Sequence, residues 1–168
     1  GVSLTGGSLA FRFDGRGASP GLSDNGTGLP EIVAFSGGDF TLNGSHSITV
    51  DRWGFLGGPL WNKAANKVAR LMGGGANGTR FTGSNQTLTV TTANGFGLDL
   101  AMDVSMSLGT TTTINVTSPA AEVGSNRNAG FTISGLISAS NFGNVVLRKT
   151  GTGVLSLTSQ GNASTLDG

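Results

Sequence analysis

The amino-acid sequence predicts an all-β protein built as a solenoid, with one short inserted helix. Gly, Thr, Ser and Asn supply close to half of the 168 residues, which is far above their usual share in soluble proteins. Hydrophobic residues still make up 36% of the chain and recur in alternating runs, which disordered chains lack. A repetitive composition with many turns favours stacked β-coils, and an antiparallel β-sandwich is the alternative.

Five segments alternate apolar residues with small polar ones, so we expect each to be a strand that buries one face. These segments are residues 8–13, 47–50, 87–90, 113–116 and 154–157. Gly-Gly, Asn-Gly and Ser-Gly steps between them supply the positive φ that tight corners require. The sequence therefore predicts short strands separated by frequent corners.

Similar phrases recur along the chain, and such recurrence indicates a repeat architecture. The phrases occupy residues 44–50, 83–90, 109–116 and 151–157. Matching their aliphatic residues, with two more, gives a predicted register of Leu9, Ile48, Leu88, Ile114, Ile133 and Leu155. The uneven steps resemble one or two coils of roughly 20 residues, the scale on which solenoids are built. The whole of 1–168 is then one solenoid domain, either part of a longer chain or a stacking subunit, because uncapped coils leave open edges.

Two stretches interrupt the β pattern. Residues 14–30 have the Gly, Pro, Ser and Asn density of a surface loop. Residues 53–80 are predicted to be an insertion that contains a helix near 60–72. The apolar residues of that helix stand at helical spacing, with Pro59 before them and three glycines after them.

The C-terminal part of the chain resembles a known family. Residues 131–141 and 145–162, and above all Leu147-Arg-Lys-Thr-Gly-Thr-Gly-Val-Leu-Ser-Leu157, are similar to the autotransporter-associated β-strand repeat. That repeat is found in passenger regions of bacterial surface proteins. The resemblance implies a right-handed parallel β-helix that is exported and displayed outside the cell, as a stalk, adhesin or scaffold. It implies no catalytic residues.

The composition argues against several kinds of site. The chain has no Cys, which excludes disulfides and thiolate sites, and its single histidine, His46, is expected at a strand entrance. Asp99 and Asp103 are expected to be solvated charges on one face of a strand. The net charge of +1 gives no basis for holding nucleic acid, and no segment is long and apolar enough for membrane insertion. We therefore expect no enzyme activity, no cofactor and no metal site.

Four aromatic residues form the densest candidate contact patch. Trp53, Phe55, Trp61 and Phe81 flank the predicted helix and could contact a sugar face or a neighbouring subunit. The alternative is that these rings seat the helix on the side of the solenoid.

Two functions follow as hypotheses. The first is a non-enzymatic extracellular structural protein, a β-solenoid that self-associates through its open ends as a filament or surface stalk. The alternative is an adhesin or glycan-binding passenger domain, with surface glycans as its partners. Both place the protein outside the cell or on a bacterial cell surface.

Overall fold

The computed structural model describes residues 2–13, 31–36, 38–52, 67–73, 78–82, 85–93, 96–106, 111–118, 130–139 and 145–159. Within these ranges all the regular elements are β-strands, and every strand pair is parallel. The all-β prediction is therefore confirmed for this part of the chain. The alternative of an antiparallel sandwich is not what these strands form.

The strands make three five-stranded parallel sheets, here called A, B and C. Sheet A contains β1 (Val2–Leu4), β4 (Phe40–Leu42), β7 (Thr79–Phe81), β10 (Val104–Met106) and β13 (Ile137–Ala139). Sheet B contains β2 (Ser8–Phe13), β5 (His46–Arg52), β8 (Gln86–Thr92), β11 (Thr111–Thr117) and β14 (Val146–Thr150). Sheet C contains β3 (Glu31–Ser36), β6 (Lys67–Met72), β9 (Gly97–Leu100), β12 (Gly130–Ile133) and β15 (Leu155–Leu157).

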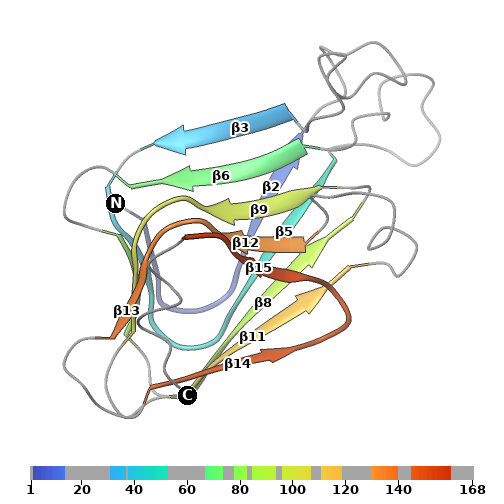
Figure 1. Ribbon diagram of the computed structural model, residues 1–168. Helices are drawn as coiled ribbons and strands as arrows, with labels where there is room; N and C mark the ends of the chain where they lie inside the picture. Colours follow the sequence, from blue (N-terminus) through green and yellow to red (C-terminus); the bar gives the residue numbers. More distant parts are fainter. Residues whose placement is uncertain are drawn as a thin grey trace, which may run out of the picture.

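The chain visits sheets A, B and C in turn, and we call each such pass a circuit. Each strand pairs with the equivalent strand of the next circuit, so β3, β6, β9 and β12 lie side by side in sequence order (Figure 1). The first circuit supplies the edge strands β1, β2 and β3, and the last supplies β13, β14 and β15. This parallel arrangement is compatible with the predicted solenoid.

The corner before sheet A is held by a ladder of backbone hydrogen bonds between circuits. The first amide of each of four sheet A strands donates to the carbonyl just before the next sheet A strand: Val2 to Asp39 at 2.7 Å, Phe40 to Gly78 at 3.3 Å, Thr79 to Asp103 at 2.8 Å and Val104 to Leu136 at 2.7 Å. The backbones approach so closely that a Cβ on Gly78 would lie 1.9 Å from the Asp103 carbonyl oxygen. Glycine is therefore required there for packing.

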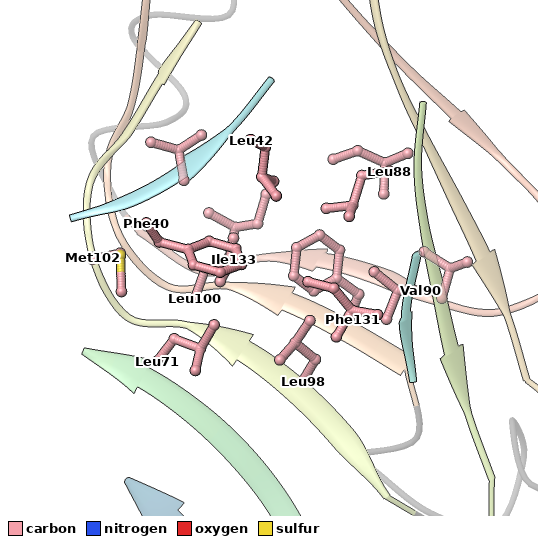
Figure 2. Packing of buried hydrophobic residues seen from close by; sticks show 14 of the residues in the cluster. Phe40, Leu42, Leu71, Leu88, Val90, Leu98, Leu100, Met102, Phe131 and Ile133 are labelled. Carbon is pink, nitrogen blue, oxygen red and sulfur yellow. The ribbon is translucent and has the colours of Figure 1, made fainter. Parts of the chain in front are cut away.

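The core lies between the three sheets. Strand β8 alternates buried and partly exposed residues along its whole length, and β11 does the same. In Figure 2, Leu98, Leu100, Phe131 and Ile133 of sheet C point toward side chains from the other two sheets, such as Val90. Hydrophobic residues with exposed fractions near zero fill this space. Burial of their side chains is the main apolar contribution to stability.

The predicted register is correct in two steps and wrong in the others. Leu9 lies opposite Ile48, and Leu88 lies opposite Ile114, as predicted. Ile48, however, lies opposite Val90 instead of Leu88. A shift of two residues keeps every side chain on the same face, so the alternating pattern cannot distinguish the two registers.

The last two members of the predicted register belong to another sheet. Ile133 and Leu155 lie in strands β12 and β15 of sheet C, whereas the residues before them lie in sheet B. The fifth strand of sheet B is β14, whose Lys149 lies opposite Ile114. Lys149 lacks the aliphatic character by which the repeat was matched.

The predicted helix is wrong where it can be compared with the structure. Residues 67–72 form strand β6, which lies between β3 and β9, so this part of 53–80 belongs to the sheets instead of an insertion. Val68, Ala69 and Leu71 are all buried, because a parallel strand can be covered on both faces. A short apolar run of this kind fits helical spacing equally well. The rest of the helix, residues 53–66, and the predicted loop at 14–30 lie outside the described residues.

Candidate functional site

Most of the exposed large hydrophobic side chains of the described residues lie in or beside sheet C. The described residues include seven large hydrophobic side chains that are exposed: Val2, Ile32, Phe35, Met72, Val146, Val154 and Leu157. Ile32 and Phe35 lie in the edge strand β3, while Val154 and Leu157 lie beside or in the opposite edge strand β15. Edge strands also carry backbone groups available for pairing, so these two ends are the candidate interaction site.

One column of side chains runs through sheet C from end to end. Paired residues place it as Phe35, Leu71, Leu100, Ile133 and Leu157. The exposed fractions along this column are 42%, 7%, 0%, 1% and 37%. The end members are exposed because each has a neighbour on one side only within the described residues.

A second column on the opposite face of the sheet repeats this pattern. It runs from Ile32 through Val68 to the paired glycines Gly97 and Gly130, and the same register continues to Val154. Ile32 is 44% exposed and Val154 40%, whereas Val68 is 8% exposed. Both faces of sheet C therefore end in exposed aliphatic or aromatic groups.

A small pocket lies beside Phe35. Its volume is ≈ 130 Å³, and it is lined by Val2, Phe35, Ser36, Gly38, Asp39, Phe40, Leu71, Met72 and Met102. Val2, Phe35 and Met72 are exposed, while Phe40, Leu71 and Met102 belong to the core. The pocket therefore opens the hydrophobic core at the β3 end of sheet C.

The other two sheets expose fewer large hydrophobic side chains in or beside their strands of the last circuit. Ile137 in the edge strand β13 of sheet A is only 1% exposed. In sheet B, the edge strand β14 exposes one large hydrophobic residue, Val146, together with the charged residues Arg148 and Lys149. Sheet C is thus where matching hydrophobic groups are exposed at both ends.

Of the predicted aromatic contact patch, only Phe81 lies among the described residues. Phe81 is 2% exposed and packs in the core, so it is unavailable as a contact for a partner. Its spacing in the sequence could not show this, because the inward face of β7 depends on pairing with β4 and β10. Trp53, Phe55 and Trp61 lie outside the described residues.

His46 begins strand β5, at the strand entrance that was predicted. Its side chain is 5% exposed, and neither ring nitrogen has a hydrogen-bond partner among the residues that the structure describes. Gln86 and Thr112, at or near the starts of β8 and β11, are also buried with unpartnered polar atoms. These three polar side chains lie where the inner strands of sheet B begin. They lower the stability of the core, since unpaired buried polar atoms cost free energy.

The prediction for Asp99 is wrong. Asp99 is 3% exposed, and its two carboxylate oxygens accept hydrogen bonds from Arg70 Nε and Ser134 Oγ, both at 2.7 Å. Asp103 is exposed, as expected, and its side chain accepts from the Leu136 amide at 3.0 Å. The two carboxylates therefore have structural partners in the neighbouring circuits.

Further polar groups join circuits in sheet B. The hydroxyls of Thr91 and Thr117 lie 2.9 Å apart, and those of Thr92 and Ser118 lie 2.6 Å apart. In the described ranges, no three His, Cys, Asp or Glu side chains come together as metal ligands would. Nor does this part of the chain contain a helix with the length and apolar character to cross a membrane.

Comparison of the chain with models of known protein families, with curated proteins and with solved structures finds no match in any of the three.

Proposed function

We propose that this chain is a segment of a right-handed parallel β-solenoid that acts as a non-enzymatic structural scaffold and extends by the addition of further circuits at its ends. The observation that carries the proposal is the exposure pattern of sheet C. Side chains in its middle strands are buried, and the equivalent side chains in β3 and β15 are exposed. One more circuit on either end would bury these groups.

The side-chain hydrogen bonds between circuits also support a structural role. Asp99 is fully engaged by Arg70 and Ser134, and these three residues come from three successive circuits. The paired hydroxyls of Thr91 and Thr117 likewise join two circuits. Such groups stabilise the stack by hydrogen bonds across its strands.

The proposed location is outside the cell, on a bacterial surface. Its support is the resemblance of residues 147–157 to the autotransporter-associated β-strand repeat. In the structure these residues form β14, the corner and β15, and a Cβ on Gly151 would lie 2.3 Å from the Val116 carbonyl oxygen. The motif glycine is thus needed for the close approach of two circuits, which fits an architectural motif.

The proposal is tested by following the assembly of purified protein of residues 1–168. Sedimentation velocity across a concentration series is expected to show growing species, and negative-stain microscopy is expected to show rods that lengthen with concentration. A chain that stays monomeric throughout the series would contradict assembly through the ends. Binding to a glycan array by such monomers would support the alternative, a glycan-binding passenger domain.

A further inference from the structure

We infer that copies of this chain stack head to tail with a single polarity, so that strand β15 of one copy pairs with strand β3 of the next and Leu157 packs on Phe35. This inference rests on the proposed function and adds the partner, a second copy, and the register of the contact.

The register follows from the columns of sheet C. Leu157 and Phe35 are the two ends of one column, and Val154 and Ile32 are the two ends of another. Placing β15 of one copy beside β3 of the next continues both columns at once. Each exposed end residue then gains a neighbour on its second side, as the buried members of its column already have inside the sheet.

The polarity follows from the strand directions. Strand β3 pairs with β6 and β15 pairs with β12, both in parallel. A second copy in the same orientation continues this parallel hydrogen-bonding pattern at its edge. Since such a head-to-tail contact uses two different surfaces, it leaves a free end on every assembly and produces a fibre unless the rotation closes a ring.

The charges in sheet C do not oppose this arrangement. Strand β15 contains no charged residue and β3 contains only Glu31, so the two edge strands carry no like charges that would repel each other. In the last circuit, the exposed Arg148 and Lys149 lie in β14 of sheet B, outside the proposed contact in sheet C. In the first circuit, Arg12 of the edge strand β2 lies opposite a residue of the other charge, Asp51 of β5.

The pocket beside Phe35 provides room for the contact. Its ≈ 130 Å³ lies next to the residue on which Leu157 of the second copy would pack. Leu71, the next member of the same column, also lines the pocket, so hydrophobic side chains are accessible beside the proposed contact. The contact is therefore expected to be centred on Phe35 and Leu157.

The test introduces one charge on each side of this contact. Phe35→Glu and Leu157→Lys each place a charge against a hydrophobic partner, so each is expected to raise the concentration needed for assembly by about tenfold or more. The double variant carries Glu and Lys on the two contacting ends and is expected to recover assembly. An equimolar mixture of the two single variants is also expected to recover it, because alternating copies satisfy every contact.

Two controls separate assembly from folding. Thr89→Lys adds a charge on the outer face of sheet B, in the middle strand β8, and is expected to assemble like the unmodified chain. Circular dichroism of each dilute variant is expected to keep the β-sheet spectrum, because Phe35 and Leu157 are already 42% and 37% exposed.

The outcomes distinguish this inference from the proposed function. If the unmodified chain assembles and both single variants assemble equally well, the head-to-tail contact through sheet C is wrong while end-to-end assembly stands. If Phe35→Glu forms dimers but no longer species, the contact is symmetric and the stated polarity is wrong. If the unmodified chain remains monomeric, the proposed assembly fails and this inference fails with it.

Discussion

Arg70 donates from Nε to Asp99 Oδ2 at 2.7 Å, and the two residues lie directly opposite each other in strands β6 and β9. Ser134, from the following circuit, donates to the other oxygen of the same carboxylate. Asp99 is buried, whereas the Arg70 side chain is 35% exposed. One carboxylate thus joins three circuits on the outer side of sheet C.

Replacing this carboxylate is expected to destabilise the fold. Asp99→Ala removes the shared acceptor and leaves the partly buried donors of Arg70 and Ser134 without it, so it is expected to lower the free energy of unfolding by about 2–3 kcal/mol. Ser134→Ala is expected to lower it by about 1 kcal/mol, because Arg70 still pairs with the carboxylate. Urea unfolding of the dilute protein measures both. An Asp99→Ala chain as stable as the original would contradict this role.

Replacing unpartnered polar groups in the core with apolar ones is expected to have the opposite effect and to stabilise the fold. Thr112→Val removes a buried hydroxyl that has no partner within the described ranges and keeps the side-chain shape, so it is expected to raise the free energy of unfolding by about 1 kcal/mol. His46→Leu is expected to act in the same direction, because His46 lies opposite Leu88.

Thr92→Val is the matched control. Thr92 is as buried as Thr112, but its hydroxyl bonds Ser118 at 2.6 Å. Thermal unfolding is therefore expected to show a lower midpoint for Thr92→Val and a higher one for Thr112→Val. Equal effects of the two substitutions would show that the hydroxyl partner does not decide stability here.

The close approach of circuits at the sheet A corner predicts a strong effect of one methyl group. Gly78→Ala places its Cβ 1.9 Å from a backbone carbonyl, which cannot move without displacing the next circuit, so a loss of about 3 kcal/mol is expected. Gly44→Ala, where φ is +94° but no atom lies within 4 Å of the added Cβ, is expected to cost only about 1 kcal/mol. Denaturant midpoints of the two variants give the comparison, and a larger loss for Gly44→Ala would contradict it.

The column in sheet C predicts that truncating its inner and end residues destabilises a single copy of the chain to different degrees. Ile133→Ala removes a side chain that is 1% exposed and is expected to cost about 2–5 kcal/mol. Leu157→Ala, at the exposed end of the same column, is expected to cost much less in dilute protein. Both are measured by urea unfolding of the dilute protein. Equal losses would show that Leu157 is buried in the single copy.

Much of the fold could be predicted from alternation and turn residues. The predicted strand at residues 8–13 matches the bounds of β2, and the others lie within or overlap observed strands. Short strands such as β4 and β7 have three residues each, which is too few for an alternating pattern to stand out. Their positions depend on pairing between circuits that are far apart in the sequence.

The candidate site could be predicted only in outline. Open edges were expected from the repeat alone, but Phe35 and Leu157 could not be matched, because their column includes residues from circuits of unequal length. Asp99 was expected in solvent because no local pattern indicates Arg70 and Ser134 as partners. In both cases the missing information is the register between circuits, which a two-residue alternation does not contain.

The most direct test of the stacked circuits is a disulfide engineered into the cysteine-free chain. Thr91 and Thr117 are paired residues in β8 and β11, and the α-carbons of such neighbours lie about 4.8 Å apart, within the range that a disulfide spans. The Thr91→Cys, Thr117→Cys variant is expected to form an intramolecular disulfide under mild oxidation, whereas Thr91→Cys with Thr113→Cys, four residues out of register, is expected to remain reduced. Efficient crosslinking of the second pair, or failure of the first, would contradict the in-register parallel stacking on which this account rests.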